Sequence, residues 1–233
     1  MQVVVYGKTL KEGNLHFVQM LFDTLHDRGI NVFVYEPYLK LLGDTVTQKR
    51  DVGVFEGYLD LKTKNIDFMI TLGGDGTILN AVSEIRDSQV PVMGINMGRL
   101  GFLASIEKTR IESAIDLLLH DRFTLDTRSL LFLETNDDKL FGNFNVALND
   151  FTILKRDTSS MITINTFING AYLATYWADG IIISTPTGST GYSLSCGGPI
   201  IFPGSGNFVI TPVAPHNLNV RPIVIAQDSV VSF

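Results

Sequence analysis

The feature that most constrains the fold is an apolar run that leads through a glycine-rich turn into a helical pattern, all within residues 68–85. Residues 68–72 (Phe-Met-Ile-Thr-Leu) are typical of a buried strand. Residues 73–77 read Gly-Gly-Asp-Gly-Thr, and apolar residues then recur at helical spacing over 78–85. The sequence therefore predicts a strand, a tight turn and a helix in direct succession.

Such a turn directs backbone N–H groups and the positive end of the helix dipole toward whatever lies above it. Glycine has no side chain, so a phosphate group can approach the backbone closely. The middle residue, Asp75, is a carboxylate, which suggests a base or a magnesium ligand for moving a phosphate. The alternative is an ordinary tight turn in which Asp75 or Thr77 caps the helix.

The first hundred residues alternate strand and helix patterns, which predicts a parallel sheet covered by helices. We expect a helix over residues 15–25 that ends near Gly29, and a mobile loop with one short helix over residues 36–65. A capping box at residues 109–112 predicts a further helix that runs to about His120. Strands are predicted over residues 3–6, 30–35, 68–72 and 90–95.

After that helix the pattern changes to short runs of β-branched and aromatic residues, with a hairpin signal at Asn169-Gly170. We therefore predict an α/β N-terminal domain with a parallel sheet, residues 1–105, followed by a mainly β C-terminal domain, residues 106–233. Residues 230–233 read as the middle of a strand, so we expect the C-terminal domain to be truncated. Strand-like runs occupy residues 123–134, 146–155, 161–168, 171–177, 180–184, 208–213, 223–226 and 229–233.

Composition excludes several classes of function. The net charge of −6 argues against nucleic acid as a main partner. The single cysteine, Cys196, excludes a disulfide framework and a thiolate zinc site, and the four histidines have no ligand spacing. No apolar run reaches transmembrane length, and the start lacks a charged segment before its apolar residues, so we expect a cytoplasmic protein without a membrane partner.

Three further stretches carry polar residues next to predicted strands. Residues 179–199 combine a buried strand with a run of hydroxyls and glycines that suits a ribose, an amide or a phosphate, with a Ser/Thr-rich surface loop as the alternative. Within it, Tyr192 could stack on a base. Asn149 and Asp150 interrupt a strand and suit ribose hydroxyls, with a strand bulge or a strand end as the alternative. Residues 96–103 are expected to form a turn that closes over the site.

Together these motifs resemble those of the NAD kinase family. Gly-Gly-Asp-Gly-Thr, Asn-x-Gly-x-x-Gly-Phe-Leu, Ala-Leu-Asn-Asp and Asp-Gly-x-Ile-x-Ser-Thr-Pro-Thr-Gly-Ser-Thr-x-Tyr-Ser occur in the family's order. The resemblance implies transfer of the γ-phosphoryl group of ATP, or of polyphosphate in some members, to the 2′-hydroxyl of the adenosine ribose of NAD. It implies a magnesium ion held through the donor phosphates, with no dedicated metal ligands, and a homodimer or homotetramer.

By that resemblance Asp75 is the catalytic residue that orients or deprotonates the hydroxyl, and Gly73, Gly74 and Thr77 bind the phosphate donor. The residues implied in NAD binding are Asp75, Gly76, Phe102, Asn149, Asp150, Asp179, Thr187, Thr190, Gly191, Tyr192, Ser193, Leu194 and Ser195. Trp177 stands at a position that is often basic in the family. Two rival functions remain: a lipid or sugar kinase that shares the glycine turn, and a catalytically silent nucleotide-binding protein.

Overall fold

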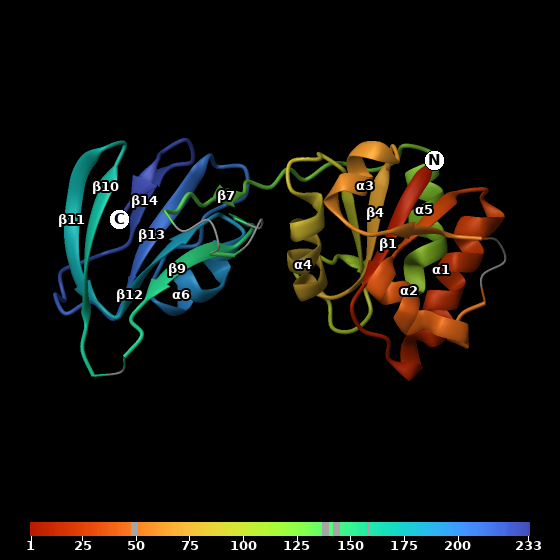
Figure 1. The fold of residues 1–233 in the computed structure, drawn as a ribbon, viewed down its shortest axis with the longest axis horizontal. Helices are drawn as coiled ribbons and strands as arrows, with labels where there is room; N and C mark the ends of the chain where they lie inside the picture. The colour runs from red at the N-terminus through yellow and green to blue at the C-terminus, as the bar shows by residue number, and fades with distance from the viewer. Residues whose placement is uncertain (48–50, 137–139, 142–144, 158) are drawn as a thin grey trace. The chain divides into compact units, whose positions relative to one another are not determined.

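The computed structural model describes residues 1–47, 51–136, 140–141, 145–157 and 159–233 (Figure 1). The chain forms two compact units, Met1–Leu125 and Asp126–Phe233. The sequence suggested a division near residue 105. The helix that follows this point packs against the first helix of the chain and carries a two-bond ion pair to it, from Arg28 to Asp116, and so belongs to the first unit.

A six-stranded parallel sheet forms the centre of the first unit, in the order β3-β2-β1-β4-β5-β6. Its central strands are buried on both faces, because apolar side chains alternate between two layers of helices. This confirms the predicted α/β architecture. The strands are β1 (Gln2–Gly7), β2 (Asn31–Tyr35), β3 (Gly53–Phe55), β4 (Phe68–Gly73), β5 (Val92–Asn96) and β6 (Ile106–Glu107).

Helices cover both faces of this sheet. On one face α1, α2 and α5 pack over residues such as Val5 and Ile70, and on the other α3 and α4 pack over residues such as Val4 and Met69. The helices are α1 (Leu15–Asp27), α2 (Glu36–Leu42), α3 (Tyr58–Thr63), α4 (Asp75–Ile85) and α5 (Ile111–Leu119), with short 3-10 turns at η1 (Glu12–Asn14), η2 (Gly43–Thr45) and η3 (Lys108–Arg110).

Two local predictions were wrong in the first unit. The segment 36–65 contains two helices and the edge strand β3, because its scattered apolar side chains Tyr38, Leu42, Phe55 and Leu61 are buried against the sheet. Part of the segment, residues 48–50, lies outside the described residues. The capping box does not form: α5 begins at Ile111 after the η3 turn, with no side-chain cap.

The second unit is mainly β, as predicted, and its sheets are antiparallel. A four-stranded sheet has the order β14-β13-β12-β9, and a three-stranded sheet has the order β11-β10-β15. Their inner faces share one apolar core. The strands are β7 (Leu131–Phe132), β8 (Val146–Ala147), β9 (Asp150–Leu154), β10 (Ile162–Ile168), β11 (Ala171–Ala178), β12 (Gly180–Ser184), β13 (Asn207–Val213), β14 (Ile223–Ala226) and β15 (Val231–Ser232).

The predicted hairpin joins β10 to β11, with both turn residues at positive φ, 50° for Asn169 and 80° for Gly170. Positive φ at both positions is the type I′ geometry that matches strand twist. The strand-like segment 123–134 forms only the short strand β7, which pairs with β8. Residues 137–139, 142–144 and 158 lie outside the described residues. After β12 the chain forms the short turn η4 (Gly188–Thr190) and helix α6 (Tyr192–Ser195).

Candidate functional site

The glycine turn lies at the carboxyl edge of the parallel sheet, between β4 and α4. The chain moves from β1 toward β2 and β3 on one side, and from β4 toward β5 and β6 on the other. The junction of β1 and β4 is therefore the point where the strand order reverses, which is where open α/β sheets bind their ligands. The 11-residue helix α4 begins at this point, so the positive end of its dipole lies there.

The three glycines of the turn have different surroundings. A Cβ atom on Gly73 would lie 1.9 Å from Thr77 Oγ1, so the packing of Thr77 requires glycine there. A Cβ atom on Gly74 or Gly76 would meet nothing within 4 Å. Gly73 is therefore required by the fold itself, whereas Gly74 and Gly76 leave open space beside the first turn of α4.

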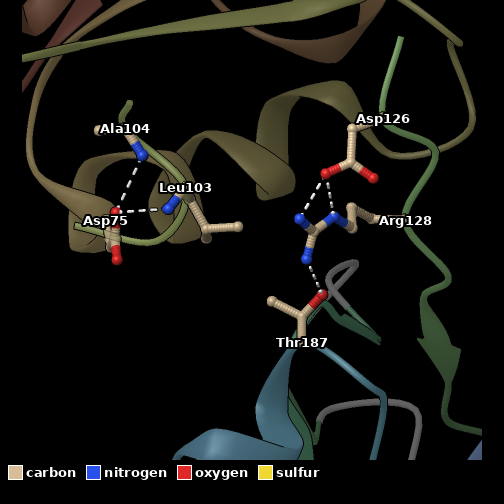
Figure 2. Close-up of polar contacts among 6 residues, drawn as sticks. All are labelled: Asp75, Leu103, Ala104, Asp126, Arg128 and Thr187. Carbon is tan, nitrogen blue, oxygen red and sulfur yellow. Dashed lines mark hydrogen bonds and ion pairs between the residues drawn. The ribbon is translucent and has the colours of Figure 1, made fainter. Parts of the chain in front are cut away.

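Asp75 is the first residue of α4, and its carboxylate accepts three backbone hydrogen bonds, of which Figure 2 shows those from Leu103 and Ala104. Phe102 N–H donates to Oδ2 at 2.8 Å, and the N–H groups of Leu103 and Ala104 donate to Oδ1 at 2.9 Å each. Burial alone would raise the pKa of Asp75, but these bonds outweigh it and hold the pKa below its usual range. The carboxylate is thus ionised at neutral pH and fixed in place.

The loop that supplies these donors is itself firmly positioned. The buried side chain of Asn96 donates to Arg99 O at 2.6 Å and accepts from Gly98 N–H at 2.7 Å. A Cβ atom on Gly101 would lie 2.3 Å from Asp75 Oδ1, so only glycine allows the loop to approach the carboxylate. Phe102 is 87% exposed and is free to contact a ligand.

In the second unit, Asn149 and Asp150 stand at the start of β9, and β9 pairs with β12. The carbonyl oxygen of Asn149 accepts a bond from Thr185 N–H at 2.9 Å, and a Cβ atom on Gly188 would lie 2.2 Å from that oxygen. Burial raises the pKa of Asp150, partly offset by a bond from the Thr152 hydroxyl. These contacts place the Asn149-Asp150 pair directly against the hydroxyl-rich segment that follows β12.

Asp179 lies between β11 and β12 and forms an ion pair with Lys155, with 2.6 Å between Nζ and Oδ1. Burial and Cys196 raise the pKa of Tyr192 most, and the charges of Asp179 and Asp150 raise it further. The pKa of Tyr192 is thus raised by the charges of two of the carboxylates that the sequence singled out, Asp150 and Asp179.

The hydroxyls of the segment after β12 fall into two sets. Ser184, Thr185 and Ser189 are buried and bond to neighbouring backbone atoms, and Ser193 is fully buried 2.8 Å from Thr211 Oγ1. The side chain of Ser193, expected to bind a ligand, is thus occupied within the unit. The second set lies partly or fully at the surface: Thr187, Thr190, Tyr192 and Ser195, with Gly191 and Leu194 exposed beside them.

Sequence reasoning missed three contacts. Lys155 could have been found from strand register, because Gly180 pairs with Leu154 and Asp179 therefore stands opposite Lys155. Arg128, which bonds to Thr187, lies far from it in sequence and gave no signal. The donors to Asp75 are backbone atoms, which no residue pattern reveals.

Within the residues that the structure describes, no three His, Cys, Asp or Glu side chains are grouped so that they could hold a metal ion. Across the same residues, no helix combines the length and apolar character needed to cross a bilayer.

Comparison with known proteins places these observations in a family. The family model described as the ATP-NAD kinase N-terminal domain matches residues 3–123, and that described as the ATP-NAD kinase C-terminal domain matches residues 148–233. The chain therefore belongs to the NAD kinase family.

The chain is also similar to individual NAD kinases over most of its length. The chain is 44% identical over 234 residues to an NAD kinase of Christiangramia forsetii, covering 99% of this chain and 79% of that protein. It is 45% identical over 228 residues to an NAD kinase of Bacteroides fragilis, covering 98% of this chain and 77% of that protein. Its fold resembles a crystal structure of yeast NADH kinase complexed with NADH, with a TM-score of 0.85, 28% identity, and coverage of 99% of this chain and 71% of that one.

Proposed function

We propose that this chain is an NAD kinase that transfers the γ-phosphoryl group of ATP to the 2′-hydroxyl of the adenosine ribose of NAD, forming NADP. The observation that carries the proposal is Asp75: an ionised carboxylate, fixed by three backbone donors, beside an open glycine turn at the carboxyl edge of the sheet. Membership of the NAD kinase family supports the choice of both substrates.

Each unit contributes its own part. Gly73, Gly74 and Thr77 bind the donor phosphates, since the turn offers backbone N–H groups and open space. The NAD-binding residues are Asp75, Gly76, Phe102, Asn149, Asp150, Asp179, Thr187, Thr190, Gly191, Tyr192, Leu194 and Ser195, with Ser193 supporting them from inside.

Asp75 acts mainly by orienting the hydroxyl. A carboxylate offers about four lone-pair positions, and three accept backbone bonds, which leaves one on Oδ2 for the ribose hydroxyl. Its lowered pKa makes it a weak base. Phosphoryl transfer passes through a loose transition state, so aiming the oxygen matters more than removing its proton early. The 2′-oxygen forms a bond to the γ-phosphorus, the bond to the bridging oxygen breaks, ADP leaves, and the hydroxyl proton is released to solvent.

A divalent metal ion, which we take to be magnesium, would neutralise charge on the donor triphosphate. Three of the roughly four lone-pair positions of Asp75 accept N–H bonds, so most ligands of the ion would come from the donor phosphates. We further propose a homodimer or homotetramer in a cytoplasmic setting. Large exposed side chains on β11, Tyr172 and Trp177, are suited to an interface between copies.

The test is to incubate the purified chain with ATP, magnesium and NAD and to follow NADP with an NADP-specific dehydrogenase. NADP formation supports the proposal. Phosphorylation of a lipid or sugar without NADP would favour a different kinase. Binding of NAD without turnover would favour a silent nucleotide-binding protein.

A further inference from the structure

Arg128 makes a contact that the proposed roles do not explain. One guanidinium nitrogen, Nη1, donates to Thr187 Oγ1 at 3.2 Å (Figure 2). Nε of the same group donates to Asp126 Oδ2 at 2.9 Å, and Nη2 contacts the same oxygen. Figure 2 shows the guanidinium between the carboxylate of Asp126 and the hydroxyl of Thr187. All three residues belong to the second unit.

The guanidinium is confined rather than free in solvent. The side chain of Arg128 is 25% exposed, against 64% for Asp126. Two nitrogens of the planar guanidinium, Nε and Nη2, contact Asp126. These two contacts limit the rotation of the guanidinium. The remaining nitrogen is thereby directed at Thr187, which lies just before the η4 turn in the segment proposed to bind NAD.

The contact with Arg128 determines whether the Thr187 hydroxyl donates or accepts its other hydrogen bond. A hydroxyl offers one donor and two acceptor positions, whereas arginine can only donate. Thr187 Oγ1 must therefore act as the acceptor toward Arg128, which leaves its own proton for another partner. The bond from Thr190 Oγ1 goes to the carbonyl oxygen of Thr187, so it does not compete for the hydroxyl. A hydroxyl that accepts a hydrogen bond from a cation such as a guanidinium also becomes a stronger donor in its own hydrogen bond.

We propose that Arg128 is a positioning residue that holds the Thr187 hydroxyl as a hydrogen-bond donor toward an acceptor oxygen of the bound dinucleotide. The inference rests on the proposed function, because it assumes that Thr187 contacts NAD. Arg128 acts through Thr187 and makes no contact with the ligand itself.

The experiment measures kcat and the two KM values for the wild type, R128M, T187V and the double variant. We expect R128M and T187V each to raise KM for NAD by about tenfold, the effect of losing one charge-assisted hydrogen bond. We expect kcat and KM for ATP to change by less than about twofold, since neither side chain meets the donor. The double variant should be no worse than T187V alone, because both changes remove the same interaction.

Two further variants separate positioning from structural support. T187S keeps the hydroxyl and should raise KM for NAD much less than T187V does. R28M removes an arginine–aspartate pair of the same chemical kind in the first unit, Arg28 with Asp116, and should leave all three constants unchanged. If R128M does not fold, the contrast between T187V and T187S still decides whether the Thr187 hydroxyl contributes to NAD binding, and an equal KM for NAD in these two variants would overturn the inference.

Several results would overturn the inference. Wild-type KM for NAD in R128M, additive effects in the double variant, or an equal rise in the KM for ATP would each show that Arg128 does not act through Thr187 on NAD. A folded wild-type chain that forms no NADP would instead refute the proposed function. The two failures are therefore distinguishable in one set of assays.

Discussion

At the scale of single residues, the side chain of Asp75 has both a structural and a chemical role. Its carboxylate anchors the backbone of residues 102–104, and it presents a remaining lone pair at the glycine turn. Any substitution there therefore changes both the loop and the chemistry. The effect of a substitution on the loop can be separated from its effect on the chemistry by measuring both the free energy of unfolding and the turnover.

Asp75→Asn should reduce turnover and stability together. The amide NH2 would face a backbone N–H donor, so at least one bond is lost and one donor is left without a partner. We expect kcat to fall by about 100-fold or more, and the free energy of unfolding to fall by about 1–3 kcal/mol. Urea titration and the coupled NADP assay measure the two effects. Asp44→Asn, at an exposed position, serves as the control. Near-normal turnover in the Asp75 variant would remove Asp75 from the mechanism.

The stability contributed by Asp75 should depend on pH in a defined direction. The pKa of Asp75 is lowered in the folded chain, so its contribution is fully present above the unfolded value of about 3.9 and is lost as pH falls through the folded value. We expect the stability difference between wild type and Asp75→Asn to be constant near neutral pH and to shrink below about pH 4. Urea titrations at several pH values measure it. A difference that grows on acidification would contradict this assignment.

Gly101→Ala tests the close approach of the loop to Asp75. The new Cβ atom would lie 2.3 Å from the carboxylate, so the loop must shift and its hydrogen bonds to Asp75 must weaken. We expect a loss of about 1–3 kcal/mol in stability and at least a tenfold loss of NADP formation. Gly98→Ala is the matched control in the same loop, since its Cβ atom would be 4.0 Å from the nearest atom, Asn96 Oδ1. Equal behaviour of the two variants would show that Gly101 is not constrained by Asp75.

At the scale of elements, strand positions could be predicted because buried strands in a parallel sheet are continuous apolar runs, as in β1 and β4. The helix starts were less predictable. Thr109 resembles an N-cap residue, yet α5 begins at Ile111. Thr109 and Arg110, the first two residues of the predicted capping box, lie in the preceding η3 turn.

In the candidate site, too, some features could be predicted from local sequence and others could not. Local motifs placed Asp75 in the turn after β4 and Asp179 between two strands, whereas Asn149, expected to interrupt one strand, lies between the separate strands β8 and β9. The partners Lys155 and Arg128 depend on register and on tertiary packing, which residue spacing does not encode.

The hairpin between β10 and β11 gives an element-scale prediction. Gly170 has φ of +80°, which an L-residue adopts only at a cost, so Gly170→Ala should lower stability by about 1 kcal/mol. Gly13→Ala, at a position where a Cβ atom meets nothing within 4 Å, should change stability by less than about 0.5 kcal/mol. Thermal unfolding of both variants measures this. No difference between them would argue against the type I′ turn.

At the scale of the whole molecule, we propose that one unit binds the phosphate donor and that the other makes most of the contacts with the dinucleotide. Hydrogen exchange can test that division on the intact chain. We expect NAD to slow exchange mainly at residues 149–150 and 187–195, and ATP with magnesium to slow it mainly at residues 73–77, because binding suppresses local opening. Protection by NAD confined to the first unit would contradict the assignment.

The most direct test of the central claim follows the phosphoryl group itself. The intact chain is incubated with NAD, magnesium and ATP labelled in its γ-phosphate, and the product is examined by phosphorus NMR and by cleavage with a phosphatase. The account predicts that the label appears as a monoester on the 2′-oxygen of the adenosine ribose, in amounts equal to the ADP released. Label found only as free phosphate, or on another hydroxyl of NAD, would contradict it.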